Sequence, residues 1–285
     1  MPDLINNLDN ILLGYLTKED LGEYKKLISD KDIVNAQYKK SNIKLESQFK
    51  CWDNFIIKID LLITFSKVKL QRDKFLDMLF HLGNTVIARG EYGEAEKIFL
   101  CIITEVRSDP PIQILEAWAY LSLSEVYSKY AYWGKSINYL KSARKIFIKE
   151  KNVKGISRCD NLMGLIEGEK GNLEKAKKIF SKNLSNGEHD ETLKGVLAIN
   201  NGIINTIQGD YETALIFYDK ALSIFEKNGD IKRLAEVRHN LGMLYTQKEE
   251  NKTALKEFNK SISLSLKSGN IFNLGLSYLQ EAFLC

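Results

Sequence analysis

The segment GDYETALIFYDKA, residues 209–221, contains the pattern that decides the fold of this 285-residue chain. After a turn sequence, Ala214 and Tyr218 stand four residues apart, which places both on one face of an α-helix. The apolar helical stretch before the turn carries Gly202, twelve residues ahead of Ala214. The segment therefore predicts two antiparallel helices that pack closely where their side chains are small.

The same pattern occurs five times between residues 76 and 266, at intervals of 38 to 41 residues. In each copy a small residue is followed twelve residues later by Ala or Ser, and an aromatic residue or Leu comes four residues after that. The first small residue is Gly83, Ser124, Gly164, Gly202 and Gly242, the second is Ala95, Ser136, Ala176, Ala214 and Ala254, and the large residue is Phe99, Leu140, Phe180, Tyr218 and Phe258. Such regular recurrence is typical of a solenoid of stacked helix pairs.

The first small residue, which we call the small position, is glycine in four of the five copies. A glycine inside a helix costs about 1 kcal/mol relative to alanine, so its recurrence needs compensating contacts. We expect the first helix of each pair to approach the second helix closely at this position, with the aromatic residue closing the pair. The predicted fold is all-α, a right-handed α-α superhelix of antiparallel helix pairs in which stacking buries what one pair cannot.

Two stretches, NLGMLY at 240–245 and the segment 209–221, resemble the tetratricopeptide repeat (TPR). The resemblance covers about two thirds of the chain. The usual repeat has 34 residues, and the longer interval here resembles the long-repeat branch that includes Rap, NprR and PlcR-type peptide receptors, kinesin light chains and the LGN adaptor. What the branch shares is a solenoid with a peptide groove, not a reaction, so the resemblance implies binding without catalysis.

The chain is predicted to divide into an N-terminal helical segment, residues 1–75, and a TPR solenoid, residues 76–285. Within the first part, residues 51–68 have the spacing of the second helix of a degenerate repeat, and a polar capping helix is expected at roughly 33–48. Residues 18–29 read as a short helix with Thr17 as its N-cap.

The solenoid is predicted to hold five full repeats and the first helix of a sixth, residues 271–284. That last helix is strongly apolar and has no sequential partner to cover one side. Three explanations are open: the chain is part of a longer protein, the surface forms a homodimer through the C-terminal helix, or it packs against the concave face of its own superhelix.

Composition excludes several function classes. The formal net charge is only +4, which does not favour nucleic acid as a partner. No signal peptide or apolar stretch of membrane-spanning length is present, and the four cysteines lack paired spacing, so we expect a cytoplasmic protein without membrane contact. The three histidines have no metal-ligand spacing, and no phosphate loop or nucleophile motif occurs. We therefore expect no enzyme, no catalytic residues, no cofactor and no metal.

A helical wheel separates the side of each first helix that faces its partner from the side that would line a groove. The groove residues predicted to bind a peptide are Asn161, Leu165, Ile199, Asn200, Ile203, His239, Asn240 and Met243. An Asn amide can both donate to and accept from a peptide backbone, and the resemblance implies this clamp at Asn200 and Asn240. The alternatives are a hydrated helix face for the polar residues and packing between adjacent copies for the apolar ones.

The function we expect is a non-catalytic peptide- or protein-binding module, a bacterial peptide-sensing regulator or adaptor that holds a short segment in its concave groove. The alternative is a constitutive scaffold for complex assembly or self-association. A ligand-induced change in compaction distinguishes the first from the second.

Overall fold

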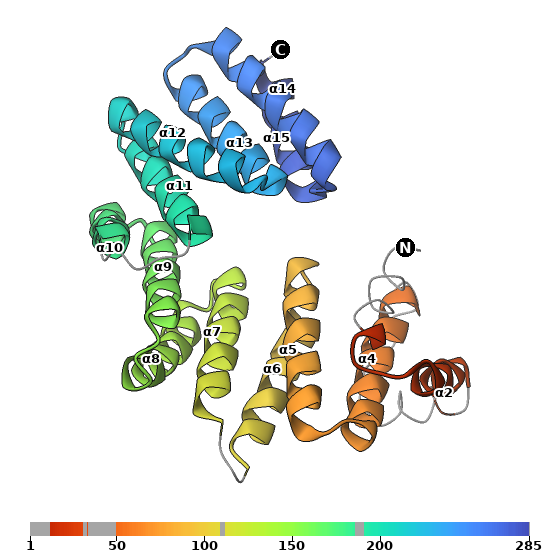
Figure 1. The fold of residues 1–285 in the computed structure, drawn as a ribbon. Coiled ribbons are helices and arrows are strands. Elements are labelled where there is room, and N and C mark those ends of the chain that lie inside the picture. The colour runs from red at the N-terminus through yellow and green to blue at the C-terminus, as the bar shows by residue number, and fades with distance from the viewer. Residues whose placement is uncertain (1–11, 31–32, 34–49, 109–111, 186–190, 285) are drawn as a thin grey trace. The chain divides into compact units, whose positions relative to one another are not determined.

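The computed structural model describes residues 12–30, 33, 50–108, 112–185 and 191–284, and within these the ordered elements are helices (Figure 1). The first helices of the five copies are α5 (Arg72–Ala88), α7 (Gln113–Lys129), α9 (Val153–Glu169), α11 (Glu191–Ile207) and α13 (Ile231–Gln247). The second helices are α6 (Tyr92–Val106), α8 (Trp133–Lys149), α10 (Leu173–Ser185), α12 (Tyr211–Asn228) and α14 (Asn251–Ser268). Outside the five pairs lie α2 (Lys18–Ser29), α4 (Lys50–Lys69) and α15 (Ile271–Leu284).

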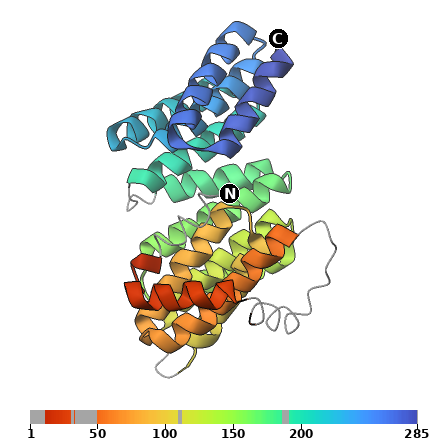
Figure 2. The same cartoon turned by 90° about the vertical axis from the view of Figure 1, so that its right-hand side faces the viewer.

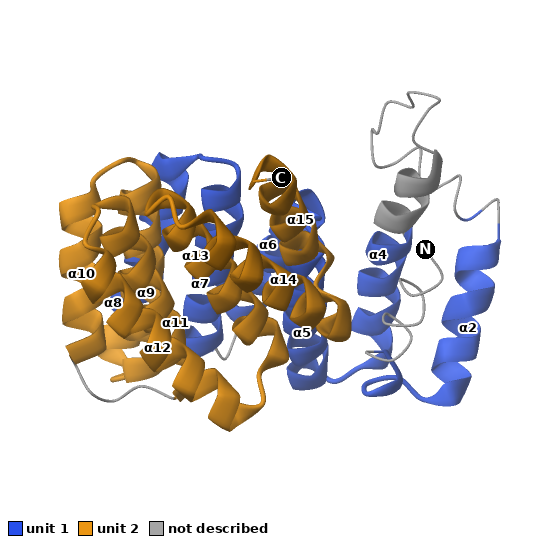
Figure 3. Ribbon diagram, turned by 90° about the horizontal axis from the view of Figure 1, so that it is seen from above, with its two compact units in different colours: residues 1–146 blue, residues 147–285 orange. Residues whose placement is uncertain are grey.

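The chain forms two compact units, residues 1–146 and residues 147–285 (Figure 3). The boundary falls inside α8, whereas the division predicted from the sequence, between residues 75 and 76, falls inside α5. The first repeat helix thus begins at Arg72, four residues earlier than the pattern indicates.

The packing at the small position is as predicted in four copies. A Cβ atom added to Gly202 would lie 2.5 Å from a ring carbon of Tyr218, and one added to Gly242 would lie 2.5 Å from Phe258. Gly83 and Gly164 face Phe99 and Phe180 in the same way. No real Cβ atom tolerates such distances, so the aromatic ring of the second helix occupies the space that glycine leaves.

The second copy, with serine at the small position, uses hydrogen bonds instead. Ser124 Oγ donates to the carbonyl oxygen of Ser136 at 2.9 Å, and Ser136 Oγ donates to the carbonyl oxygen of Ser124 at 2.7 Å. Both side chains are fully buried. Because each buried hydroxyl has its partner, the pair joins α7 to α8 without an unsatisfied polar group.

The turn inside each pair also repeats. The residue seven positions after the small position has a positive φ in every copy: Gly90 81°, Ala131 56°, Gly171 83°, Gly209 80° and Glu249 61°. A residue in the left-handed conformation at the end of a helix lets the following N–H groups donate hydrogen bonds to the last carbonyl groups of that helix. Three copies meet this requirement with glycine, and two meet it with a side chain that is strained there.

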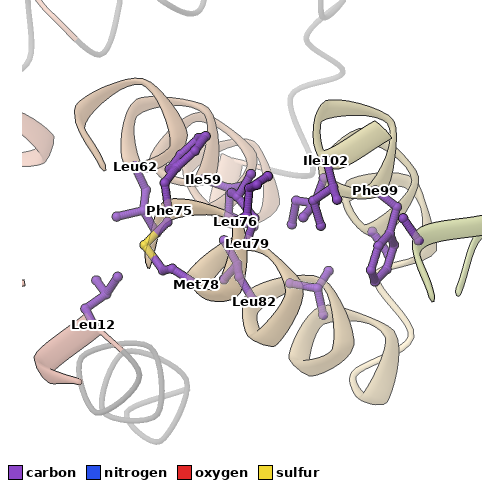
Figure 4. Close-up of a cluster of buried hydrophobic side chains, with 14 of the residues drawn as sticks. Leu12, Ile59, Leu62, Phe75, Leu76, Met78, Leu79, Leu82, Phe99 and Ile102 are labelled. Atoms are coloured by element: carbon purple, nitrogen blue, oxygen red, sulfur yellow. The ribbon is translucent and has the colours of Figure 1, made fainter. Parts of the chain in front are cut away.

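The N-terminal helices of unit 1 pack into the hydrophobic core of that unit. Thr17 caps α2 through a capping box with Asp20, which confirms the predicted N-cap. α2 packs against α4, and buried Ile59 and Leu62 of α4 join Leu76 and its neighbours in one hydrophobic cluster (Figure 2, Figure 4). The capping helix predicted at 33–48 lies outside the described residues.

Candidate functional site

The predicted groove lies on the first helices of unit 2, which contact one another in series from α9 through α11 and α13 to α15. One side of each first helix faces its own second helix, as the small position shows. Part of the opposite side is covered by the neighbouring first helices. This series of contacts decides which of the predicted groove residues reach the surface.

Two predicted groove residues are buried at the contact between copies. Ile199 is 1% exposed and belongs to the cluster of buried residues that α11, α12 and α13 share, and Asn200 is 7% exposed. They stand three and two residues before the small position, on the side that meets the adjacent first helices. In this conformation Ile199 contributes to packing between copies and offers no surface to a ligand.

Asn200 forms a hydrogen bond inside the protein. Its Nδ2 donates to Oδ1 of Asn161 at 2.7 Å, which connects α11 to α9. An asparagine amide has two donor hydrogens and one acceptor oxygen, and this bond uses one donor of Asn200. The pair of amides therefore joins two repeats. Only the amide groups that this hydrogen bond does not use are left to bind a peptide backbone.

Three other predicted groove residues are apolar and stand at the same position of successive copies, and we call them the inner row: Leu165, Ile203 and Met243. Each directly follows the small position of its copy. Leu165 is 37% exposed, and Ile203 and Met243 are half-buried. The equivalent residues of the first two copies are Asn84 and Glu125, so only unit 2 carries the apolar row.

His239 and Asn240 complete the predicted set, and both are half-buried on α13. The Nδ1 atom of His239 lies 3.0 Å from the Oγ atom of Ser277 in α15, and its ring centroid is 5.6 Å from that of Phe258. Burial lowers the pKa of His239, which favours the neutral imidazole at neutral pH. The ring therefore acts as a hydrogen-bonded packing residue between α13 and α15.

A buried polar network lies next to His239 and was not predicted from the sequence. Asn273 Nδ2 donates to Ser261 Oγ at 2.9 Å and to Ser265 Oγ at 2.8 Å, and the hydroxyls of Ser277 and Ser261 are 3.0 Å apart. These four side chains join α14 to α15. A signal was present, because Ser261 and Ser265, like Asn273 and Ser277, are spaced four residues apart and so share one helix face.

In unit 1, Tyr15 covers part of α5, the first helix of the first copy. Tyr15 donates a hydrogen bond to Oδ2 of Asp77 at 2.7 Å, and its hydroxyl also contacts Nδ1 of His81. Burial, together with the neighbouring Asp77 carboxylate, raises the pKa of Tyr15 to about 12. His81 stands two residues before the small position Gly83, as the predicted groove residue Asn200 does in its copy. Tyr15, a residue 66 positions away in sequence, therefore already occupies this part of the face.

Within the described residues, no cluster of three or more His, Cys, Asp or Glu side chains could hold a metal ion. A cavity of about 310 Å³ lies among α12, α13 and α14, where Arg238 Nη1 contacts Glu257 Oε2 at 3.0 Å. Among the described helices, none combines the length and the apolar character needed to cross a membrane.

Comparison with known proteins supports the repeat assignment. The tetratricopeptide repeat family matches residues 195–267, which run from α11 to α14. No curated protein has a matching sequence.

Similar solved structures cover most of the chain. A Rap protein complexed with competence and sporulation factor is 15% identical, with a TM-score of 0.62 over 93% of this chain and 79% of that one. NprR in complex with its cognate peptide NprX is 19% identical, with a TM-score of 0.62 over 93% and 83%. Aspartyl phosphate phosphatase F from Bacillus subtilis is 17% identical, with a TM-score of 0.61 over 94% and 80%.

The predicted α-α superhelix is confirmed by these structural relatives and by the paired helices of both units. The matched residues include the small position of two copies, Gly202 and Gly242, where the aromatic ring of the second helix packs. Residues 195–267 match the tetratricopeptide repeat family, and the chain as a whole resembles the Rap and NprR proteins in its fold.

Proposed function

We propose that this protein is a cytoplasmic, non-catalytic regulator or adaptor whose unit 2 binds a short peptide segment along the inner row. The observation that carries the proposal is the row itself: Leu165, Ile203 and Met243 repeat one partly exposed apolar side chain per copy on helices in series. Apolar side chains that recur on a solvated surface contribute no stability there, whereas a bound peptide with apolar side chains would bury them.

Two structural relatives support the choice of a peptide as ligand. One Rap structure contains competence and sporulation factor, and the NprR structure contains its cognate peptide. The low sequence identity limits this support to the shared fold, so the residues that contact a ligand must be argued from this chain.

The proposed ligand is an extended or helical segment with spaced apolar side chains and few charges. Apolar residues would lie over the inner row, and backbone groups would reach Asn240 and the second donor of Asn200 beside it. The Asn161–Asn200 hydrogen bond fixes the Asn200 amide before binding, which reduces the entropy lost when a ligand orders.

The test is a binding screen with a pool of random heptapeptides on the purified chain, followed by titration of an enriched peptide. Leu165→Glu and Met243→Glu are each expected to weaken binding at least tenfold, because a carboxylate would be buried against apolar side chains. Ile216→Glu changes an exposed residue of α12, is the matched control and should leave affinity unchanged. Enriched peptides that bind equally well to all three variants would refute the inner row as the site.

A constitutive scaffold is the alternative function. A regulator changes its compaction when the peptide binds, and small-angle scattering at saturating peptide measures that change. A scattering curve that is identical with and without bound peptide would favour the scaffold.

A further inference from the structure

The turn between α7 and α8 carries tyrosines where the other copies have polar side chains. Tyr130 stands six residues after the small position of its copy, and Tyr132 stands eight residues after it. In the other four copies the first of these positions holds Arg89, Lys170, Gln208 and Lys248, and the second holds Glu91, Asn172, Asp210 and Glu250. The repeat therefore forms its turn without an aromatic residue at either position.

The backbone of this turn is the same as in a copy that has polar residues. The N–H groups of Ala131 and Tyr132 donate to carbonyl groups of α7 at 2.9 Å, as those of Gly209 and Asp210 donate to α11. Asp210 also caps α12, because its side chain accepts a hydrogen bond from the Thr213 N–H. Tyrosine is not among the residues that cap a helix in this way. The turn thus gains nothing from its tyrosines, and their presence needs another explanation.

Both tyrosines belong to a row of rings in unit 1, which we call the tyrosine patch: Tyr92, Tyr130 and Tyr132. The ring centroids of Tyr92 and Tyr130 are 5.7 Å apart, with the rings edge to face, and those of Tyr130 and Tyr132 are 6.0 Å apart. Tyr130 is 42% exposed and Tyr132 is 58% exposed, while Tyr92 is half-buried. Neighbouring rings that stay accessible to solvent are a common mark of a contact surface.

Carboxylates lie close to the patch. Burial raises the pKa of Tyr130, and the negative charges of Glu94 and Glu96 in α6 raise that pKa further. Burial also raises the pKa of Glu91, with the nearby Glu94 adding to the rise and Arg89 opposing it. The patch therefore combines aromatic rings with carboxylates, and both features attract a cation.

A cation of the chain itself already lies on these rings. The Nζ atom of Lys135 is 5.9 Å from the ring centroid of Tyr132 and 5.0 Å from that of Tyr127. Tyr127 in turn donates a hydrogen bond to Glu96. The rings thus accept a positive charge in the folded protein, while Tyr132 remains more than half exposed.

We infer that the tyrosine patch is a second binding site and that it receives an arginine-bearing segment of a partner protein. A guanidinium group uses both features, because it stacks on tyrosine rings and its planar set of N–H groups donates to carboxylates. A partner rich in phosphate or carboxylate groups is disfavoured, since the glutamates repel it. The site belongs to unit 1 and does not depend on peptide binding at the inner row.

Calorimetric titration of the purified chain with a synthetic peptide of alternating arginine and glycine tests the inference. A peptide of the same length with citrulline in place of arginine has nearly the same shape but lacks the charge. The arginine peptide should bind at least tenfold more tightly than the citrulline peptide, and its affinity should fall as the salt concentration rises. Equal affinities for the two peptides would overturn the inference.

The double variant Tyr130→Gln/Tyr132→Asn gives the second copy side chains that other copies have in the same turn, Gln208 and Asn172. Its melting temperature should therefore not fall, whereas its affinity for the arginine peptide should fall at least tenfold. Tyr278→Gln removes a tyrosine of α15 that is 48% exposed, and as the control it should leave the affinity unchanged. A double variant that binds as tightly as the wild type would exclude the tyrosine patch as the site.

A substitution of Lys135 leaves the three tyrosines in place and tests the sign of the charge that binds. Lys135→Met removes the ammonium group that competes for the Tyr132 ring, so the arginine peptide should bind at least threefold more tightly. An acidic ligand would instead lose an attractive charge. Weaker binding of the arginine peptide to Lys135→Met would contradict a cation site on these rings.

Discussion

Asn200 of α11 donates a hydrogen bond to Asn161 of α9 across a distance of 2.7 Å, and this bond connects two consecutive repeats of unit 2. Asn200 is almost fully buried, so its amide has exchanged water for a partner within the protein. Removing it leaves Asn161 Oδ1 without that donor and opens a small space between the helices.

We therefore expect Asn200→Ala to lower the free energy of unfolding by about 1–3 kcal/mol. Urea unfolding of Asn200→Ala, Asn161→Ala and the double variant measures the coupling, which should be about 1 kcal/mol. Strictly additive single effects would show that the hydrogen bond does not connect the repeats energetically.

The space at the small position gives a second prediction. Gly202→Ala places a methyl group against the Tyr218 ring and should destabilise the protein by about 1–3 kcal/mol, despite the better helix propensity of alanine. Gly22→Ala is the matched control in α2, where nothing lies within 4 Å, and it should stabilise by about 1 kcal/mol. Thermal unfolding of both variants should therefore shift in opposite directions, and a shift of the same sign would contradict the packing argument.

The turn after α13 is strained at Glu249, which has a φ of 61° where the first, third and fourth copies have glycine. A left-handed conformation costs a residue with a side chain about 1–2 kcal/mol, and glycine avoids this cost. Part of the resulting gain in stability is lost because glycine makes the unfolded state more flexible. Glu249→Gly is expected to raise the free energy of unfolding by about 0.5–1 kcal/mol. The reverse change, Gly209→Ala, should lower it by a similar amount, as chemical denaturation can show.

Acid should weaken unit 2 through His239. Burial lowers the pKa of His239 in the folded state, while an unfolded histidine titrates near 6.5. The unfolded state therefore takes up a proton first as the pH falls, so stability is complete above about pH 6.5 and declines below it. Melting temperatures at pH 7.5 and pH 5 should differ more for the wild type than for His239→Gln, and equal differences would assign the acid sensitivity to other groups.

The parts of the structure that depend on local periodicity could be predicted from the sequence. Gly202 and Tyr218 lie sixteen residues apart in one hairpin of helices, so their contact follows from the helical spacing and a short turn. The inner row is a prediction of the same kind, since the wheel places Leu165 away from the side that faces the second helix.

The parts that depend on neighbouring copies could not be predicted in the same way. A wheel gives the direction of a side chain but not the distance to the next helix, so it could not show that Ile199 and Asn200 are buried there while Met243 remains partly exposed. Tyr15 reaches Asp77 from outside the repeats, and no periodic pattern links the two. Whether the amides and the inner row hold a ligand remains a prediction.

One side chain per repeat also makes the inner row a measure of length. Packed helices are about 8–10 Å apart, and an extended chain advances about 3.3 Å per residue, so successive first helices would meet every third residue of an extended ligand. Leu165, Ile203 and Met243 would then span about seven residues. A surface built in this way distinguishes peptides by the interval between their apolar residues as much as by the identity of those residues.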